Sequence, residues 1–225
     1  MFFLDPLYII LALPGLLFGL YASMKTKSTF HRYSRYAAAS RMTGAQAARR
    51  LLDREGLHDV RVEQVQGFLS DHYDPRHRVL RLSPDVYNSP SLSAIGVACH
   101  EAGHAIQHAA HYAPLQWRSA LVPITQFSTN AVYFIFLAGL FMNLQPLMHA
   151  AIIMFSVVVL FTLVTLPVEW DASARAKRLM VSAGIVSERE QVDAGRVLNA
   201  AFLTYVAALV SSILTLLYYI MRARR

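Results

Sequence analysis

Two histidines and a glutamate near the middle of the chain have the types and spacing of a zinc-dependent hydrolytic site. The segment His100-Glu101-Ala102-Gly103-His104 is an HExxH pattern. On a helix, with about 100° of rotation per residue, the two histidines lie about 40° apart around the axis and one turn apart along it, so both imidazoles can reach one Zn²⁺. Glu101 stands beside that face, where its carboxylate can accept a proton from a zinc-bound water and pass it to the leaving amine. The pattern predicts hydrolysis of a peptide bond.

The alternative to a metal site is a His-rich surface helix with an incidental glutamate. His108 and His111 continue the same helical pattern, as a generic polar stripe would. Neither completes the zinc site. His108 is two turns, about 12 Å, from His100 along a straight helix. His111 misses by one residue the position of the third histidine in the metzincin pattern.

A catalytic zinc usually has three protein ligands and keeps its fourth position for water or substrate, so a further ligand is needed. Glu169, at the end of an apolar segment, is the remaining candidate, because a carboxylate at the edge of a bilayer is costly without a partner. A salt bridge to Arg175 and a simple interfacial residue are the alternatives.

The residues around the motif predict a small α+β domain. Capping and turn residues, together with the hydrophobic periodicity, mark its elements. The expected order is a helix over residues 43–54 capped by Thr43, a strand over 60–65, a turn over 71–76 around Pro75, a strand over 78–82, and the motif helix over 91–111 capped by Ser91 or Ser93.

Four other segments are long and apolar enough to cross a bilayer, whose core about 20 helical residues span. They cover residues 7–22, 120–142, 147–168 and 200–221. The chain is 55% hydrophobic and only 16% charged. This composition excludes a disordered chain and predicts a mainly α polytopic membrane protein that carries the small α+β domain.

We expect five consecutive segments. They are a transmembrane anchor (1–22), a cytoplasmic catalytic domain with the HExxH helix (23–118), a transmembrane hairpin (119–168), a cytoplasmic segment with the third ligand (169–199), and a hydrophobic helix with a basic tail (200–225).

Basic residues predict the orientation. Lys25, Lys27, Arg32 and Arg35 follow the first apolar segment and none precedes it, so the positive-inside rule puts the catalytic domain in the cytoplasm. The basic tail at 222–225 disagrees if all four segments cross, unless one is re-entrant or packed inside the protein. The net charge of +7 is then explained by the basic residues that orient the chain in the membrane and by the basic tail. The sequence contains no basic patch with interleaved aromatic residues, so it does not indicate nucleic-acid binding.

Cys99 is the single cysteine. It excludes an intramolecular disulfide and a Cys-rich zinc finger. It is on a different face of the helix from His100, and we expect a small buried residue rather than a nucleophile.

Several motifs, taken together, resemble the YugP-type neutral zinc metallopeptidases of bacterial membranes. They also resemble, more distantly, glutamate zincins such as HtpX. The resemblance covers nearly the whole chain. The motifs are the HExxH block with Ala105-Ile106-Gln107-His108, Asp71-His72-Tyr73-Asp74-Pro75, Leu80-Arg81-Leu82-Ser83-Pro84-Asp85-Val86-Tyr87, Val168-Glu169-Trp170-Asp171-Ala172-Ser173, and Val197-Leu198-Asn199-Ala200-Ala201.

The resemblance implies one Zn²⁺ per chain held by His100, His104 and Glu169, with Glu101 as general base. It also implies a peptide or protein substrate and a location in the bacterial inner membrane. In the HtpX-like pattern an Asp follows the glutamate ligand by four positions, whereas here that position is Ser173 and the acid is Asp171.

The sequence leaves alternatives for the groups that hydrogen-bond to the ligand histidines. Asp171 or a residue of the 71–74 turn could accept the second N–H of a ligand histidine, and Asp74-Pro75 is otherwise a turn former. The resemblance also implies a short edge strand that pairs with substrate, for which residues 78–82 are the candidate. A hydrogen-bond donor for the oxyanion could be Tyr205, His108 or His72.

Two rival functions remain. A non-proteolytic zinc-binding scaffold or chaperone would leave Glu101 without a proton-transfer role. A transporter is less favoured, because no charged residue lies inside the second to fourth apolar segments. The oligomeric state is not encoded in any pattern.

Overall fold

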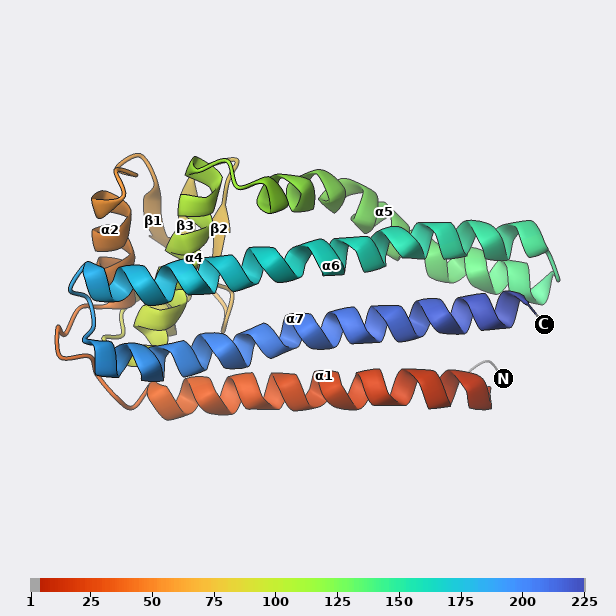
Figure 1. Cartoon of the computed structure of the whole chain (residues 1–225), viewed down its shortest axis with the longest axis horizontal. Coiled ribbons are helices and arrows are strands. Elements are labelled where there is room, and N and C mark those ends of the chain that lie inside the picture. Colours follow the sequence, from red (N-terminus) through yellow and green to blue (C-terminus); the bar gives the residue numbers. More distant parts are fainter. Residues whose placement is uncertain (1–4, 225) are drawn as a thin grey trace. The chain divides into compact units, whose positions relative to one another are not determined.

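A computed structural model describes residues 5–224 and is mainly helical (Figure 1). The helices are α1 (Pro6–Tyr33), α2 (Gly44–Arg54), α3 (Pro84–Tyr87), α4 (Leu92–Ala109), α5 (Ala113–Phe141), α6 (Gln145–Ser182) and α7 (Glu188–Ala223). The strands are β1 (Arg61–Gln64), β2 (His72–Asp74) and β3 (Val79–Leu82).

The chain divides into two compact units. The polar unit contains residues 24–115 and 168–203, and the membrane unit contains residues 5–23, 116–167 and 204–224. The long helices α1, α6 and α7 contribute residues to both.

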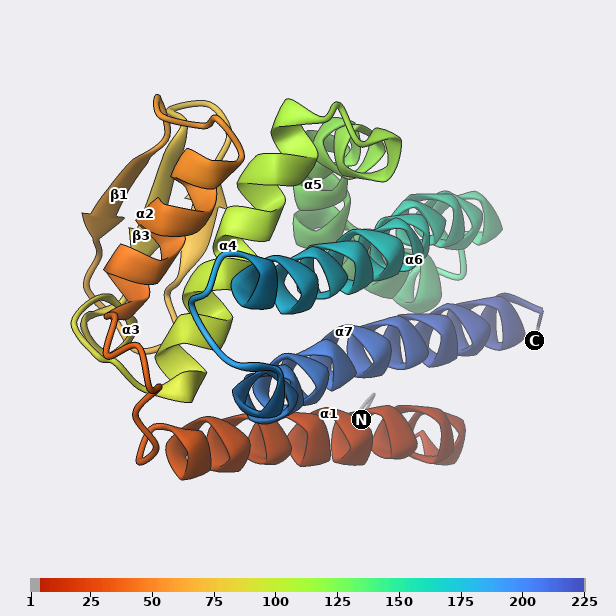
Figure 2. The same ribbon diagram turned by 60° about the vertical axis from the view of Figure 1, so that its left-hand side comes forward.

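The polar unit is built on a three-stranded sheet of order β1-β3-β2. Strand β3 pairs in parallel with β1, with Arg61 opposite Val79, and antiparallel with β2, with His72 opposite Arg81. Helices α2 and α4 pack side by side over one face of this sheet (Figure 2). The core between these elements contains fully buried aliphatic side chains, among them Leu51, Leu52, Leu80, Ile95 and Met180.

Both predicted helices of the polar unit form, and their first turns explain why. Thr43 and Gln46 form a capping box: the Thr43 hydroxyl accepts the Gln46 N–H at 3.3 Å, and the Gln46 side chain accepts the Thr43 N–H at 2.9 Å. The Ser91 hydroxyl likewise accepts the Ala94 N–H at 3.3 Å. Past the end of α2, Gly56 adopts a φ of 75°, a conformation that glycine takes without steric cost.

Two expectations about the sheet are wrong. Residues 72–74 form a strand instead of part of a turn. The turn comes after this strand, because the Asp74 carboxylate accepts the N–H groups of Arg76 and His77. Residues 78–82 do not form an edge strand, since β3 is central and has a partner on each side. Its core position explains why Val79, Leu80 and Leu82 are all fully buried instead of alternating.

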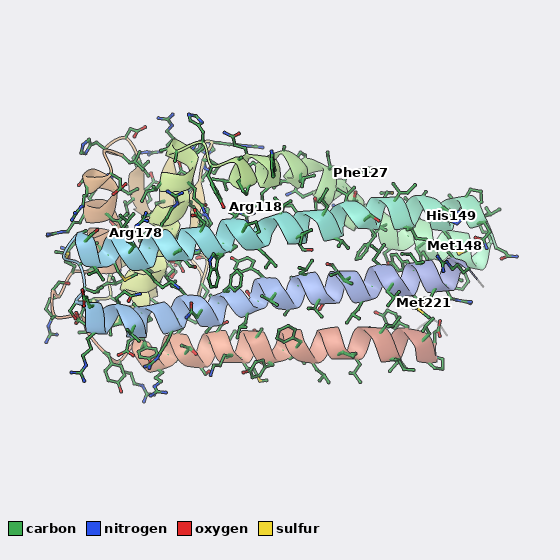
Figure 3. All side chains as sticks on the ribbon, viewed as in Figure 1. Arg118, Phe127, Met148, His149, Arg178 and Met221 are labelled. Atoms are coloured by element: carbon green, nitrogen blue, oxygen red, sulfur yellow. The ribbon has the colours of Figure 1, made fainter. Side chains whose placement is uncertain are left out.

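In the membrane unit, apolar side chains cover the surface. All four long helices are long and apolar enough to cross a membrane, as predicted for a polytopic membrane protein. Phe127 on α5 is 69% exposed (Figure 3), and Leu16, Phe134 and Ile153 are also exposed. A surface of this kind is stable in lipid and would aggregate in water.

The basic tail belongs to a continuous helix. Helix α7 runs unbroken from Glu188 to Ala223, and few residues of its apolar stretch are buried. Whether all four segments cross the bilayer stays a prediction. The Arg222 guanidinium lies 3.8 Å from the Asp5 carboxylate, which also accepts the Tyr218 hydroxyl at 3.2 Å. Within the membrane unit, the tail arginine is therefore partly neutralised by an acid of the N-terminal segment.

Candidate metal centre

The HExxH histidines and Glu169 come together where α4 packs against the polar-unit part of α6. A Cβ atom on Gly103 would lie only 2.7 Å from the Ala172 carbonyl oxygen. Because only glycine leaves room for this backbone, α4 and α6 can approach closely at the motif. This approach places the turn that carries Glu169 beside His100 and His104.

The three side chains have the spacing of metal ligands. Glu169 Oε2 lies 3.2 Å from His100 Nε2 and 3.5 Å from His104 Nε2. Neighbouring ligand atoms of a tetrahedral zinc, each about 2.0–2.1 Å from the ion, are about 3.4 Å apart. Two imidazole nitrogens and a carboxylate oxygen are also a donor set that zinc prefers. The residues present therefore fit the ion that the sequence predicts.

Glu169 is not the partner of Arg175. The Arg175 guanidinium instead donates to Asp171 at 2.6 Å, so the salt-bridge alternative is wrong. Glu169 is also not an interfacial residue, because only 2% of its surface is exposed. A carboxylate buried this deeply needs cations or strong donors around it, and both imidazoles lie within 3.5 Å of it.

Gln107 fixes the ring of His104. Its amide nitrogen donates to the Val168 carbonyl and to the Asp171 carboxylate, each at 2.8 Å. Both partners only accept hydrogen bonds, so the amide oxygen must face His104, whose Nδ1 lies 3.0 Å away. That contact places the proton on Nδ1 and leaves the Nε2 lone pair toward Glu169. Gln107 is completely buried.

His100 has a different partner. Its Nδ1 lies 3.1 Å from the hydroxyl of Ser173, the residue four positions after Glu169. The expected partners were Asp171 or a residue of the 71–74 turn. Asp171 instead acts indirectly, through Gln107, and Asp74 stabilises its own turn.

Glu101 lies close enough to Asp71 and His104 for its charge to affect their pKa values. It is 9% exposed. Burial raises the pKa of Asp71, with a further increase from the charge of Glu101, although hydrogen bonds from Ser83 oppose the shift. Burial lowers the pKa of His104, but the hydrogen bond that the protonated ring donates to Glu169 and the charges of Glu169 and Glu101 outweigh it, so the net pKa is raised.

The other candidates are not part of the ligand group. His108 Nδ1 contacts the Tyr73 hydroxyl at 3.0 Å, and His72 Nδ1 contacts the Ser70 carbonyl at 2.8 Å. Tyr205 belongs to the membrane unit, and its role as an oxyanion donor stays a prediction. Cys99 is fully buried, which raises the pKa of its thiol to about 12, so it is not a nucleophile at neutral pH.

Comparison with known proteins agrees with this geometry. Residues 8–224 match the family described as "Putative neutral zinc metallopeptidase". The chain belongs to this family. It is 46% identical over 215 residues to "Putative membrane protease YugP" of Bacillus subtilis, covering 96% of each chain. No solved structure matches. The YugP-type resemblance read from the motifs is thus confirmed.

Within this zinc metallopeptidase family member, Gln107 is the residue of the centre that sequence reasoning missed. Its place three residues after His104 puts both on one helix face, which is the signal that could have found it. The sequence drew attention to Ser173 only as a departure from the HtpX-like pattern.

Proposed function

We propose that this protein is a zinc-dependent endopeptidase embedded in the membrane. His100, His104 and Glu169 hold the ion, one per chain, and Glu101 is the general base. The observation that supports the proposal is the meeting of three candidate ligands beside a buried glutamate.

The number of ligands favours catalysis over a scaffold role. Structural zinc sites are usually closed by four protein ligands, whereas catalytic sites have three and keep one position open. Among residues 5–224, the candidate ligand group contains His100, His104 and Glu169 and no fourth side chain. A scaffold or chaperone would have no use for the open position or for Glu101.

In the proposed reaction, a bound zinc would supply Lewis acidity, which makes water more acidic and polarises a carbonyl. The residues of this chain do the rest. Glu101 takes the proton of the attacking water and then delivers it to the amine that leaves. Gln107 and Ser173 hold the two imidazoles in the orientation and tautomer that ligands need.

The edge of β2 is a candidate surface for the substrate backbone. Strand β2 contacts α4 and forms one edge of the sheet, and no described strand pairs with its outer side. An extended peptide could add to that edge through main-chain hydrogen bonds, which depend little on its sequence. We therefore assign the substrate strand to β2.

We place the polar unit on the cytoplasmic side of a bacterial inner membrane. Lys25, Lys27, Arg32 and Arg35 follow the apolar part of α1, and basic residues of this kind stay in the cytoplasm.

The test of the function is metal-dependent cleavage. Full-length protein purified in detergent should cleave an unstructured protein such as casein, lose that activity after dialysis against a zinc chelator, and regain it with stoichiometric zinc. Cleavage can be followed by gel electrophoresis and by mass spectrometry of the new termini. Activity that survives complete zinc removal would contradict the proposal, and zinc binding without any cleavage would favour the scaffold.

Removing Gln107 should weaken zinc binding although Gln107 does not touch the ion. In Gln107→Leu we expect zinc affinity to fall about 10–100-fold, the usual effect of losing a partner of a ligand histidine. Affinity is measured by competition with a chromophoric chelator. Gln66→Leu, at an exposed position, controls for the leucine substitution. Equal affinity in wild type and Gln107→Leu, with helicity unchanged, would refute the role.

A further inference from the structure

A cavity in the polar unit shares no residue with the metal centre. It has a volume of about 630 Å³ and lies between α1 and α7. It is lined by Lys25, Thr29, Arg32, Tyr33, Arg196, Asn199, Ala200 and Leu203.

Three cations border this cavity, and they are only partly neutralised. In the described part of the chain, no ion pair joins Lys25 or Arg32 to a carboxylate, and the Arg32 guanidinium lies over the Tyr33 ring at 5.6 Å. Arg196 is shared between Asp193 at 2.6 Å and the Tyr33 hydroxyl at 3.0 Å. The cavity therefore keeps a net positive charge and suits an anion.

The cavity changes from polar to apolar along its length. The two helices run antiparallel here: Arg196 reaches Tyr33, while further along the Thr26 hydroxyl donates to the Ala200 carbonyl at 3.0 Å. Arg32 and Arg196 thus lie at the end farther from the apolar stretches. Lys25 lies just past the apolar stretch of α1, which ends at residue 22, and Leu203 lies where that of α7 begins.

This arrangement distinguishes a lipid from a soluble anion. Guanidinium groups bind phosphate oxygens with matched, bidentate geometry, and lysine adds a point charge. A free phosphate needs only these cations, whereas a lipid also needs an apolar exit for its chains. Basic pockets between helices on the cytoplasmic side of membranes bind anionic head groups for this reason.

We propose that this cavity binds the phosphate of an anionic phospholipid. Lys25, Arg32 and Arg196 contact the head group, and the acyl chains leave past Leu203 into the bilayer. The inference is independent of proteolysis and holds whether or not the protein cleaves peptides.

Matched charge variants test the site. We compare the triple variant Lys25→Gln, Arg32→Gln, Arg196→Gln with the triple Lys27→Gln, Arg35→Gln, Arg189→Gln, which removes three exposed cations that do not line the cavity. Native mass spectrometry of full-length protein in detergent measures the binding of added phosphatidylglycerol. We expect about fivefold weaker binding per removed cavity cation, so roughly 100-fold for the first triple, and little change for the second.

Three results would overturn the proposal. Equal losses in both triples would indicate general surface attraction. Equal binding of zwitterionic phosphatidylcholine would show that the charge of the head group does not matter. Displacement of phosphatidylglycerol by millimolar inorganic phosphate would identify a free phosphate as the ligand. If the first triple fails to fold, Lys25→Gln alone, compared with Lys27→Gln, carries the test: we expect about a fivefold loss against none.

Discussion

Glu101→Gln should reduce peptide hydrolysis by about 10²–10⁴-fold, the contribution typical of a general base, and leave zinc content unchanged. Glutamine has nearly the same shape as glutamate but cannot accept the proton of the attacking water. Because Glu101 is not among the three side chains of the ligand group, the substitution should not disturb binding of the ion. The measurements are initial cleavage rates at saturating zinc and zinc content by elemental analysis.

The control for this variant is Glu55→Gln, at an exposed position past the end of α2. It should cleave like the wild type. If Glu101→Gln also cleaves at the wild-type rate, Glu101 is not the base. If it loses both activity and zinc, the glutamate supports the metal centre and its catalytic role is unproven.

Glu169→Ala should abolish tight zinc binding. It removes one of three ligands, so the loss of affinity should exceed the 10–100-fold that an outer partner such as Gln107 costs. It also leaves the histidine rings without the carboxylate that lies 3.2 and 3.5 Å from them. We expect zinc to fall from one per chain to a small fraction after gel filtration, with hydrolysis lost in parallel.

Glu55→Ala serves as the matched carboxylate control and should keep its zinc. Retention of full, tight zinc occupancy in Glu169→Ala would remove Glu169 from the proposed ligands. A circular-dichroism spectrum like that of the wild type is needed for both variants, because Glu169 is buried and its loss leaves a cavity.

Local patterns predicted the helices because local interactions determine them. The caps at Thr43 and Ser91 and the four long apolar stretches depend on residues close together in the sequence. Glu169 could be proposed as a ligand for a similar reason: a carboxylate at the end of an apolar segment stands out without knowledge of the fold.

The sheet and the second layer of the metal centre depend on distant contacts. Strand β2 has three residues, two of them polar, and only its pairing with β3 makes it a strand. Gln107 donates hydrogen bonds to Val168 and Asp171 on α6, which are 61 and 64 positions away in the sequence. Its contact with His104 therefore depends on the helix packing that Gly103 permits. The sequence pattern on α4 alone contains neither partner.

The most direct test of the metal centre is the position of the ion itself. Anomalous diffraction at the zinc edge from crystals of the full-length protein should locate one zinc per chain. The ion should lie about 2.0–2.2 Å from His100 Nε2, His104 Nε2 and a carboxylate oxygen of Glu169. A zinc bound by other residues, or these three side chains turned to separate partners with no ion between them, would contradict the account.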